Sequence, residues 1–233
     1  TSTTSGFTNT LNVLANATDV DATHTLCVKG IKAGTASGAG TAVTASTTSA
    51  NGTEVVGSFG TIKIGADGSY TYAVDQANAT VQALNTNSTA LSDVFTYTVQ
   101  DAAGLSSTAT ITVSVTGAND APVAVNDTAT IGEAGGSNNG TAGSALTSTT
   151  SGFTNTLNVL ANDTDVDSGD TKAVKDIKAG TAAGAGTAVT AATTSANGTA
   201  IIGSFGTLTI GADGSYTYAV EQANATVQAL NTN

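Results

Sequence analysis

The 233-residue chain is long enough for one large domain or two of ordinary size, and only 4% of it is aromatic. The chain has seventeen acidic residues and only six lysines, for a net charge of −11. It therefore lacks the clustered cations that nucleic-acid binding requires. The single cysteine, Cys27, excludes an internal disulfide, and no apolar run approaches the roughly 18 residues of a membrane span. Val, Ile, Leu and Ala must therefore build most of the core, while abundant Thr, Gly and Asn favour strands and turns.

The first half of the chain predicts short strands and one helical turn. Residues 10–14 alternate enough to predict a strand, and the Gly-, Ala-, Thr- and Ser-rich run 33–52 is consistent with either a long loop or weakly patterned strands. Residues 61–74 predict a hairpin with its turn at 65–68. Residues 78–84 begin with an asparagine that can cap a helix, so one or two helical turns are predicted there.

Two further segments extend this β pattern. Residues 94–99 and 108–115 predict a second pair of antiparallel strands, joined by a short loop. Residues 122–131 predict the first strand of the next unit, with Pro122 at its start, where no ladder donor is lost. Short strands at regular spacing, separated by turns, predict an all-β Greek-key sandwich.

A long internal repeat dominates the sequence. Residues 1–87 align without a gap on residues 147–233 at a constant offset of 146, and 72 of the 87 positions are identical. Such identity indicates a recent duplication within a longer array. The best linker candidate is the segment 117–122, which holds the only proline. We therefore expect residues 1–120 to form the later part of one repeat and residues 121–233 the first, larger part of the next, which would run past residue 233.

Three segments carry a resemblance to a known family: GTIKIGADGSYTYAVDQANATVQALN from Gly60, LSDVFTYTVQDAAG from Leu91 and ATITVSVTGANDAPVAVND from Ala109. Together they resemble the VCBS repeat of giant bacterial surface adhesins. The resemblance implies an immunoglobulin- or cadherin-like sandwich in a very long, exported and often calcium-rich protein. The runs ANDAP at 118–122 and LANDTDVDSGDT at 160–171 are also similar to cadherin-type interdomain elements.

The second of these runs places oxygen-bearing side chains at alternate positions beside a glycine. Ca²⁺ prefers six to eight hard oxygen ligands from flexible, carboxylate-bearing loops, and alternating aspartates can converge on one ion. We therefore predict a calcium site at the junction, which the ion would stiffen; a solvated, Asp-rich turn is the alternative. The candidate ligands in this part are Asn119, Asp120, Asp163, Asp165, Asp167 and Asp170. The equivalent loop of the first copy retains Asp19 and Asp21 but has lost two acids.

Other polar and aromatic side chains favour structural roles. The Asp-Gly pairs at 67–68 and 213–214 predict hairpin turns. Asp93 and Asp101 flank a predicted strand and are interpreted as loop residues. The tyrosine pairs at 70 and 72 and at 216 and 218 predict core or cross-strand contacts rather than sugar-stacking platforms.

No catalytic constellation recurs in both copies. His24 is the only histidine and aligns with Asp170, so a catalytic triad or a zinc site would be missing from the second copy. We therefore predict that the chain is not an enzyme.

The predicted function is a structural repeat module of an extracellular, cell-surface adhesin shaft or matrix filament, a spacer in cell adhesion or biofilm. Its expected partners are neighbouring repeats of the same protein and homotypic filament contacts, with surface glycans as a further candidate. Neither nucleic acid nor membrane insertion of this segment is expected. Two alternatives remain open: a carbohydrate- or ice-binding module with Thr-rich faces, and a self-assembling filament whose subunits exchange strands.

Overall fold

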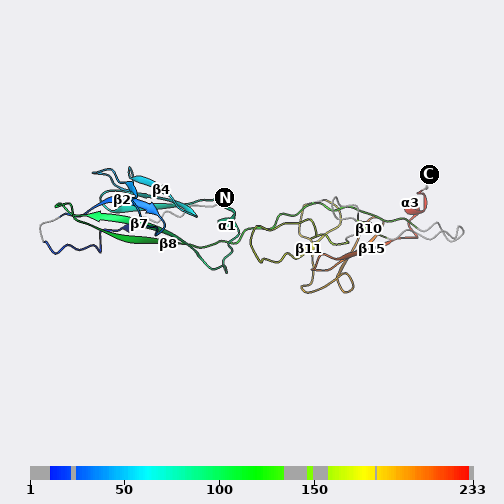
Figure 1. Cartoon of the computed structure of the whole chain (residues 1–233). Helices are drawn as coiled ribbons and strands as arrows, with labels where there is room; N and C mark the ends of the chain where they lie inside the picture. The colour runs from blue at the N-terminus through cyan, green and yellow to red at the C-terminus, as the bar shows by residue number, and fades with distance from the viewer. Residues whose placement is uncertain (1–10, 22–24, 134–145, 149–156, 182, 231–233) are drawn as a thin grey trace. The chain divides into compact units, whose positions relative to one another are not determined.

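The computed structural model describes residues 11–21, 25–133, 146–148, 157–181 and 183–230 (Figure 1). The chain divides into two compact units, Thr1–Asn119 and Asp120–Asn233, which we call the first and second units. None of the helices within the described ranges has the length and hydropathy of a membrane-spanning helix.

The first unit contains two four-stranded antiparallel sheets, ordered β1-β6-β5-β4 and β3-β2-β7-β8 (Figure 1). The chain crosses from one sheet to the other after β1, after β3 and after β6, which confirms the predicted all-β sandwich. The strands are β1 (Leu11–Asn12), β2 (Cys27–Ala33), β3 (Thr41–Ala42), β4 (Thr53–Val56), β5 (Gly60–Ile64), β6 (Ser69–Val74), β7 (Leu91–Gln100) and β8 (Ser106–Val115).

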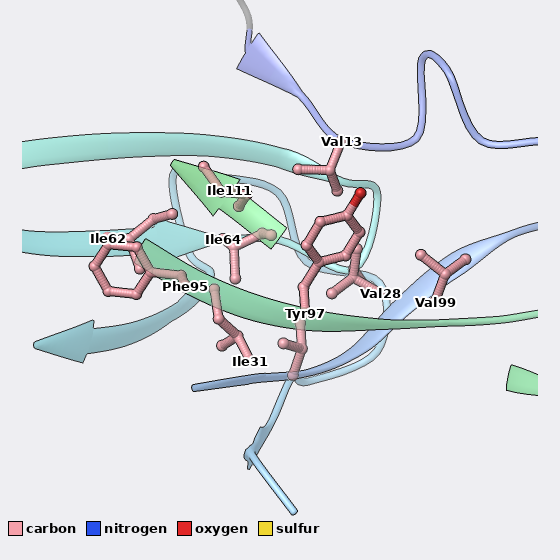
Figure 2. Close-up of a cluster of buried hydrophobic side chains, with 11 residues drawn as sticks. Val13, Val28, Ile31, Ile62, Ile64, Phe95, Tyr97, Val99 and Ile111 are labelled. Carbon is pink, nitrogen blue, oxygen red and sulfur yellow. The ribbon is translucent and has the colours of Figure 1, made fainter. Parts of the chain in front are cut away.

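The core of the first unit is formed by inward-facing side chains of both sheets. From Asp93 onward, the side chains of β7 alternate between buried and half-buried positions, and Phe95 is completely buried. Figure 2 shows its ring beside Ile62, and Ile64 lies in the same cluster, so β7 packs on β5 of the other sheet. Each such fully buried apolar side chain contributes about 1.5–3 kcal/mol to folding. Phe95 also pairs across the ladder with Ile111 of β8, which belongs to the same cluster.

The predicted hairpins and helical turn of the first unit are confirmed. Strands β5 and β6 pair in register from Gly60 opposite Val74 to Ile64 opposite Tyr70. Strands β7 and β8 pair over their whole length and are longer than the sequence pattern indicated. Helix α1 (Ala79–Gln82) begins after Asn78, whose side chain accepts a hydrogen bond from the backbone N–H of Thr80 at 2.9 Å.

The second unit repeats part of this architecture. Its largest sheet has the order β13-β14-β15, and two-residue strands form the pairs β9–β10 and β11–β12. A core cluster joins Val189, Ile210, Ala212 and Tyr216. The elements are β9 (Ala129–Thr130), β10 (Thr147–Ser148), β11 (Asp176–Ile177), β12 (Thr187–Ala188), β13 (Thr199–Ile202), β14 (Gly206–Ile210), β15 (Tyr216–Val220) and α3 (Ala225–Gln228).

Two strand predictions differ from the structure, and the structure decides between the two alternatives left open for residues 33–52. The segment 122–131 is not a continuous strand, because Val123 pairs with Thr164 in an isolated bridge and only β9 is regular. The predicted strand at 10–14 is reduced to β1 in the described residues, since the Asn12 side chain accepts from the N–H of Leu14 and turns the chain. In 33–52, turns dominate and β3 is the only strand that begins there.

Candidate functional site

The acidic loop, residues 162–170, is attached by its backbone to the start of the second unit. The N–H of Val123 donates to the carbonyl of Thr164 at 2.8 Å, and the N–H of Thr164 donates back at 3.1 Å. The N–H of Val125 donates to Asp163 Oδ1 at 2.7 Å. The antiparallel pairing at Val123 is thus limited to one bridge, because the N–H of Val125 bonds to the Asp163 carboxylate instead of a backbone carbonyl.

Side chains of the acidic loop alternate between the interior and solvent. Asp163 and Asp165 are half-buried and Asp167 is only 4% exposed, whereas Thr164 is exposed and Val166 is 50% exposed. Burial thus follows the alternate spacing of the three aspartates, although the chain bends at Val166 and Asp167. The loop therefore turns carboxylates toward the protein and apolar or hydroxyl groups outward.

Asp167 is the most deeply buried acid of this loop. Its Oδ2 accepts the N–H of Asp120 at 2.5 Å, and its own N–H donates to Asp165 Oδ1 at 3.0 Å. Its second oxygen, Oδ1, is buried without a hydrogen-bond partner among the described residues, as is the Oδ1 of Asn162. A buried oxygen without a partner carries a desolvation cost of about 1–3 kcal/mol, more when it is charged.

The acidic loop ends in a turn, and a lysine that follows it contacts the loop backbone. Gly169 has φ +86°, a left-handed conformation that glycine adopts without strain. The ammonium of Lys172 donates to the backbone carbonyl of Asp163. Within the described ranges, no three His, Cys, Asp or Glu side chains gather closely enough to hold a metal ion. The calcium ligands thus stay predictions. Asn119 belongs to the first unit, and its predicted role is untested.

The equivalent loop of the first unit is more open. Asp19 Oδ1 accepts the N–H of Asp21 at 2.9 Å, which matches the bond between Asp165 and Asp167. Asp21 is exposed, and both acids line a cavity of about 500 Å³ with Asp101. His24 lies outside the described residues. Ala17 stands where the second copy has Asp163.

The hairpin-tip aspartates have the predicted turn roles. Asp67 Oδ1 accepts from the N–H and the hydroxyl of Ser69, at 2.9 and 2.6 Å. Asp213 makes the same pair of bonds with Ser215, at 3.0 and 2.6 Å. Each tip has a glycine with φ +81°. These acids stabilise tight turns.

Asp93 is the polar residue whose role the sequence interpretation got wrong. It is not a loop residue: it lies within β7, is 2% exposed and faces the core. Its carboxylate accepts the N–H groups of Ser58 and Phe59, both at 3.0 Å, and the hydroxyl of Tyr72 at 2.7 Å. The signal that identifies it is its period-two spacing with Phe95 and the other buried residues of β7.

Tyr72 confirms the predicted core role of this tyrosine. Its ring meets Phe95 edge to face, with centroids 6.1 Å apart. Burial and the hydrogen bond to Asp93 raise the pKa of Tyr72 above its ordinary value. The arrangement therefore keeps the hydroxyl protonated and donating, which locks β7 onto β6.

Comparison with known proteins assigns the matched part of the chain to one family. A family model described as the bacterial cadherin-like domain matches residues 1–117, half of the chain and nearly all of the first unit. No curated protein and no solved structure matches the chain. Residues 147–233 repeat the first 87 residues of the matched segment with 15 substitutions.

Proposed function

The chain belongs to the bacterial cadherin-like domain family, and on this basis we propose that it is a spacer in the shaft of an extracellular bacterial adhesin or matrix fibre. The observation that carries the proposal is the repetition of 72 of 87 residues at a constant offset of 146. Copies of one sandwich placed in series add length with each repeat. An enzyme, in contrast, gains little from a second copy of its catalytic domain beside the first.

The construction of the first unit supports a mechanical role. Its two sheets enclose a continuous cluster that includes Phe95, Ile62 and Ile64, each fully buried. Strands β7 and β8 pair over ten residues each, and a long antiparallel ladder must break many hydrogen bonds together before it opens. A module of this kind transmits tension along a fibre while keeping its fold.

Calcium is the second part of the proposal, as the ion that rigidifies the acidic loop. The candidate ligands are hard carboxylate oxygens, the kind that Ca²⁺ prefers. The buried Oδ1 of Asp167 has no hydrogen-bond partner among the described residues. These carboxylates are not gathered around one point among the described residues, so Asp163, Asp165, Asp167 and Asp170 would have to converge to hold the ion together with Asp120. The bound charge would offset the mutual repulsion of these carboxylates and stabilise the segment that begins the second unit.

Calorimetric titration of the 233-residue chain with Ca²⁺ tests the calcium part. We expect Asp167→Asn to weaken calcium binding at least tenfold, roughly 1.4 kcal/mol. The matched control is Asp176→Asn, which removes the same charge from an exposed position in β11. Absence of calcium binding by the unaltered chain, or equal effects of the two substitutions, would refute the calcium site.

Small-angle scattering of the same chain tests the spacer role. An extended particle whose maximum dimension does not change with protein concentration is the expected result, and chelation should broaden its distribution of distances. A compact particle in which both units share one globular envelope would contradict a spacer.

One observation favours a second candidate, a carbohydrate- or ice-binding surface. Thr96 pairs with Thr110 and Thr98 with Thr108 across β7 and β8, and Thr108 and Thr110 are exposed. Rows of threonine on one sheet face are the feature that this alternative requires. Glycan arrays and ice-recrystallisation assays of the chain test it, with Thr108→Val and Thr110→Val as the variants that should abolish any activity.

A further inference from the structure

Strand β13 (Thr199–Ile202) is the end strand of its sheet, and no described residue pairs with its outer edge. The N–H of Gly203 donates to the carbonyl of Gly206 at 2.8 Å, so these two residues form a hydrogen-bonded pair at the end of the hairpin. Hydrogen-bonded and non-hydrogen-bonded pairs alternate along an antiparallel ladder. The N–H and C=O groups of Ala200 and Ile202 therefore point away from β14, toward the free edge.

This edge is free beside either segment that flanks the repeat. In the first unit, β7 and β8 follow the repeated residues, yet β4 is still the end strand of its sheet and Val56 is 74% exposed. In the second unit, β9 precedes the repeated residues, yet β13 is the end strand and Ile202 is 79% exposed. The free edge is thus a feature of both described copies.

The two copies differ in charge at this edge. Glu54 of β4 and Lys63 of β5 lie opposite each other and form an ion pair of 2.9 Å in the first unit. Their counterparts, Ala200 and Thr209, also lie opposite each other, and both are uncharged. Charged side chains on an end strand protect natural proteins against edge-to-edge pairing. The first unit has this protection, and the second unit lacks it.

The sheet of the second unit presents a neutral outer face next to the free edge. The side chains that share the outward face of Ile202 are all uncharged: Ala200, Ile202, Thr207, Thr209, Thr217 and Ala219. The chain as a whole has a net charge of −11, so two copies repel each other at acidic surfaces. A second copy can approach this edge without bringing like charges together.

We propose that β13 pairs edge to edge with β13 of a second copy of the chain, antiparallel, about a two-fold axis at Ile201. In this register Ala200 lies opposite the second copy's Ile202, so a small side chain faces a large one. Each such pair closes two backbone hydrogen bonds, and the two pairs together use all four free groups of each strand. The two Ile201 side chains meet at the axis. This contact goes beyond the spacer function and does not depend on it.

The same register is unfavourable for the first unit. It would place the Glu54 carboxylate against the second copy's Val56 and remove water from the charge. The two Glu54 residues would also become diagonal neighbours, roughly 7–8 Å apart. The pairing is therefore specific to β13.

The contact involves one short strand from each copy and is weak. We expect a dissociation constant in the millimolar range. Single chains therefore predominate at the micromolar concentrations of the scattering experiment, and the contact is populated where copies are held close together.

Disulfide trapping with single-cysteine variants tests the register. Cys27 is first replaced by alanine, the residue at its counterpart Ala173. In that background, Ile201→Cys should give a disulfide-linked dimer at least tenfold faster than Ile202→Cys, because only position 201 lies opposite itself across the axis. Ile202 is 79% exposed and Ile201 is half-buried, so random collision would give the reverse order. Val55→Cys, the matched control in the first unit, should not be trapped. Faster trapping at position 202, or equal trapping at position 55, would overturn the proposal.

Sedimentation equilibrium from micromolar to millimolar concentration tests the role of charge. The unaltered chain should be a monomer in equilibrium with a dimer. Ala200→Glu combined with Thr209→Lys gives β13 the ion pair of the first unit and should weaken dimerisation at least tenfold. The reverse exchange, Glu54→Ala combined with Lys63→Thr, should create a second pairing edge and produce species larger than dimers. Hydrogen exchange of β14 and β5 checks that each variant keeps its fold.

Three sedimentation results would contradict edge pairing. They are an unaltered chain that stays monomeric at millimolar concentration, an introduced ion pair that does not weaken dimerisation, and a reverse exchange that yields no species larger than dimers. Dimerisation should survive chelation of calcium, so failure here is distinguishable from failure of the calcium site.

Discussion

The two units contain nearly the same 87 residues but bury them differently. Ile62 is fully buried in the first unit, whereas its counterpart Leu208 is half-buried in the second. Leu84 and Leu230 differ in the same direction. The first unit includes β7 and β8, which supply Phe95 and several other members of its core. Burial therefore depends on the strand pair that covers a residue, and not on the local sequence.

Local structure, in contrast, is the same in both units. The hairpin register places Ile64 opposite Tyr70 and Ile210 opposite Tyr216. Asn78 and Asn224 cap their helices with the same bond, 2.9 Å to the second helical N–H. Turns, caps and hairpins are thus specified within short segments of the repeat, while the stability of the sandwich requires distant strands.

The largest predicted effect is the loss of the central ring. Phe95→Ala should destabilise the first unit by about 3–5 kcal/mol, because a cavity replaces a fully buried side chain. Cys27 offers a readout specific to this unit, since it is the only cysteine and lies half-buried in β2. Thiol labelling in increasing urea measures the change. Phe205→Ala, at a 51% exposed position, is the control. If this variant changed the urea concentration at which Cys27 is labelled, the claim that the two units have separate cores would be refuted.

A methyl group added at equivalent glycines should have opposite outcomes. Gly57→Ala places its methyl group against Asp93 and Phe95, so about 1–3 kcal/mol of stability should be lost in the first unit. Gly203→Ala meets open space and should leave the second unit within about 0.5 kcal/mol of its original stability. Cys27 labelling reports the first variant and hydrogen exchange of β14 the second. Equal losses would mean that the space beside Gly203 is filled.

The two equivalent tyrosine hydroxyls give a smaller contrast. Tyr72→Phe removes a hydrogen bond to a buried carboxylate and should cost the first unit about 1–2 kcal/mol. Tyr218→Phe removes a hydroxyl that has no acceptor among the described residues, so no measurable change is expected. The same two readouts apply, and a larger loss in the Tyr218 variant would reverse the assignment.

The smallest effect is a dependence on alkaline pH. Burial and the bond to Asp93 raise the pKa of Tyr72, so the folded chain keeps a proton that the unfolded chain loses above about pH 10. Stability of the first unit is therefore fully present below that pH and falls as the pH rises further. Urea unfolding followed by circular dichroism between pH 8 and 11 should show this slope, and Tyr72→Phe should flatten it. Burial raises the pKa of Tyr70 in the same direction, so part of the slope should remain in that variant.

The sequence predicted the features that depend on neighbouring residues and missed those that depend on distant segments. The hairpin at 61–74 and the helix cap at Asn78 depend on neighbouring residues, and both were predictable. The segment 122–131 was wrong as a strand because its pairing with the acidic loop is a single bridge, and the N–H of Val125 bonds to the Asp163 side chain instead of a backbone carbonyl. Asp93 was interpreted as a loop residue, but its spacing of two residues from Phe95 places both side chains on the same face of β7.

The calcium ligands are predictable only as a set of donors. Alternate spacing of Asp163, Asp165 and Asp167 indicates a shared side, and their burial follows that alternation. Spacing cannot specify convergence on one ion, because that depends on how the loop folds against the segment that begins the second unit.

Native-state hydrogen exchange of the unaltered 233-residue chain tests most directly the claim that the strand pair, and not the repeated sequence, completes the sandwich. After correction for intrinsic rates, amides of β5 in the first unit should exchange at least about 100-fold more slowly than the equivalent amides of β14 in the second. Equal protection of β5 and β14 would contradict the account, because it would mean that the repeated 87 residues form an equally stable fold without β7 and β8.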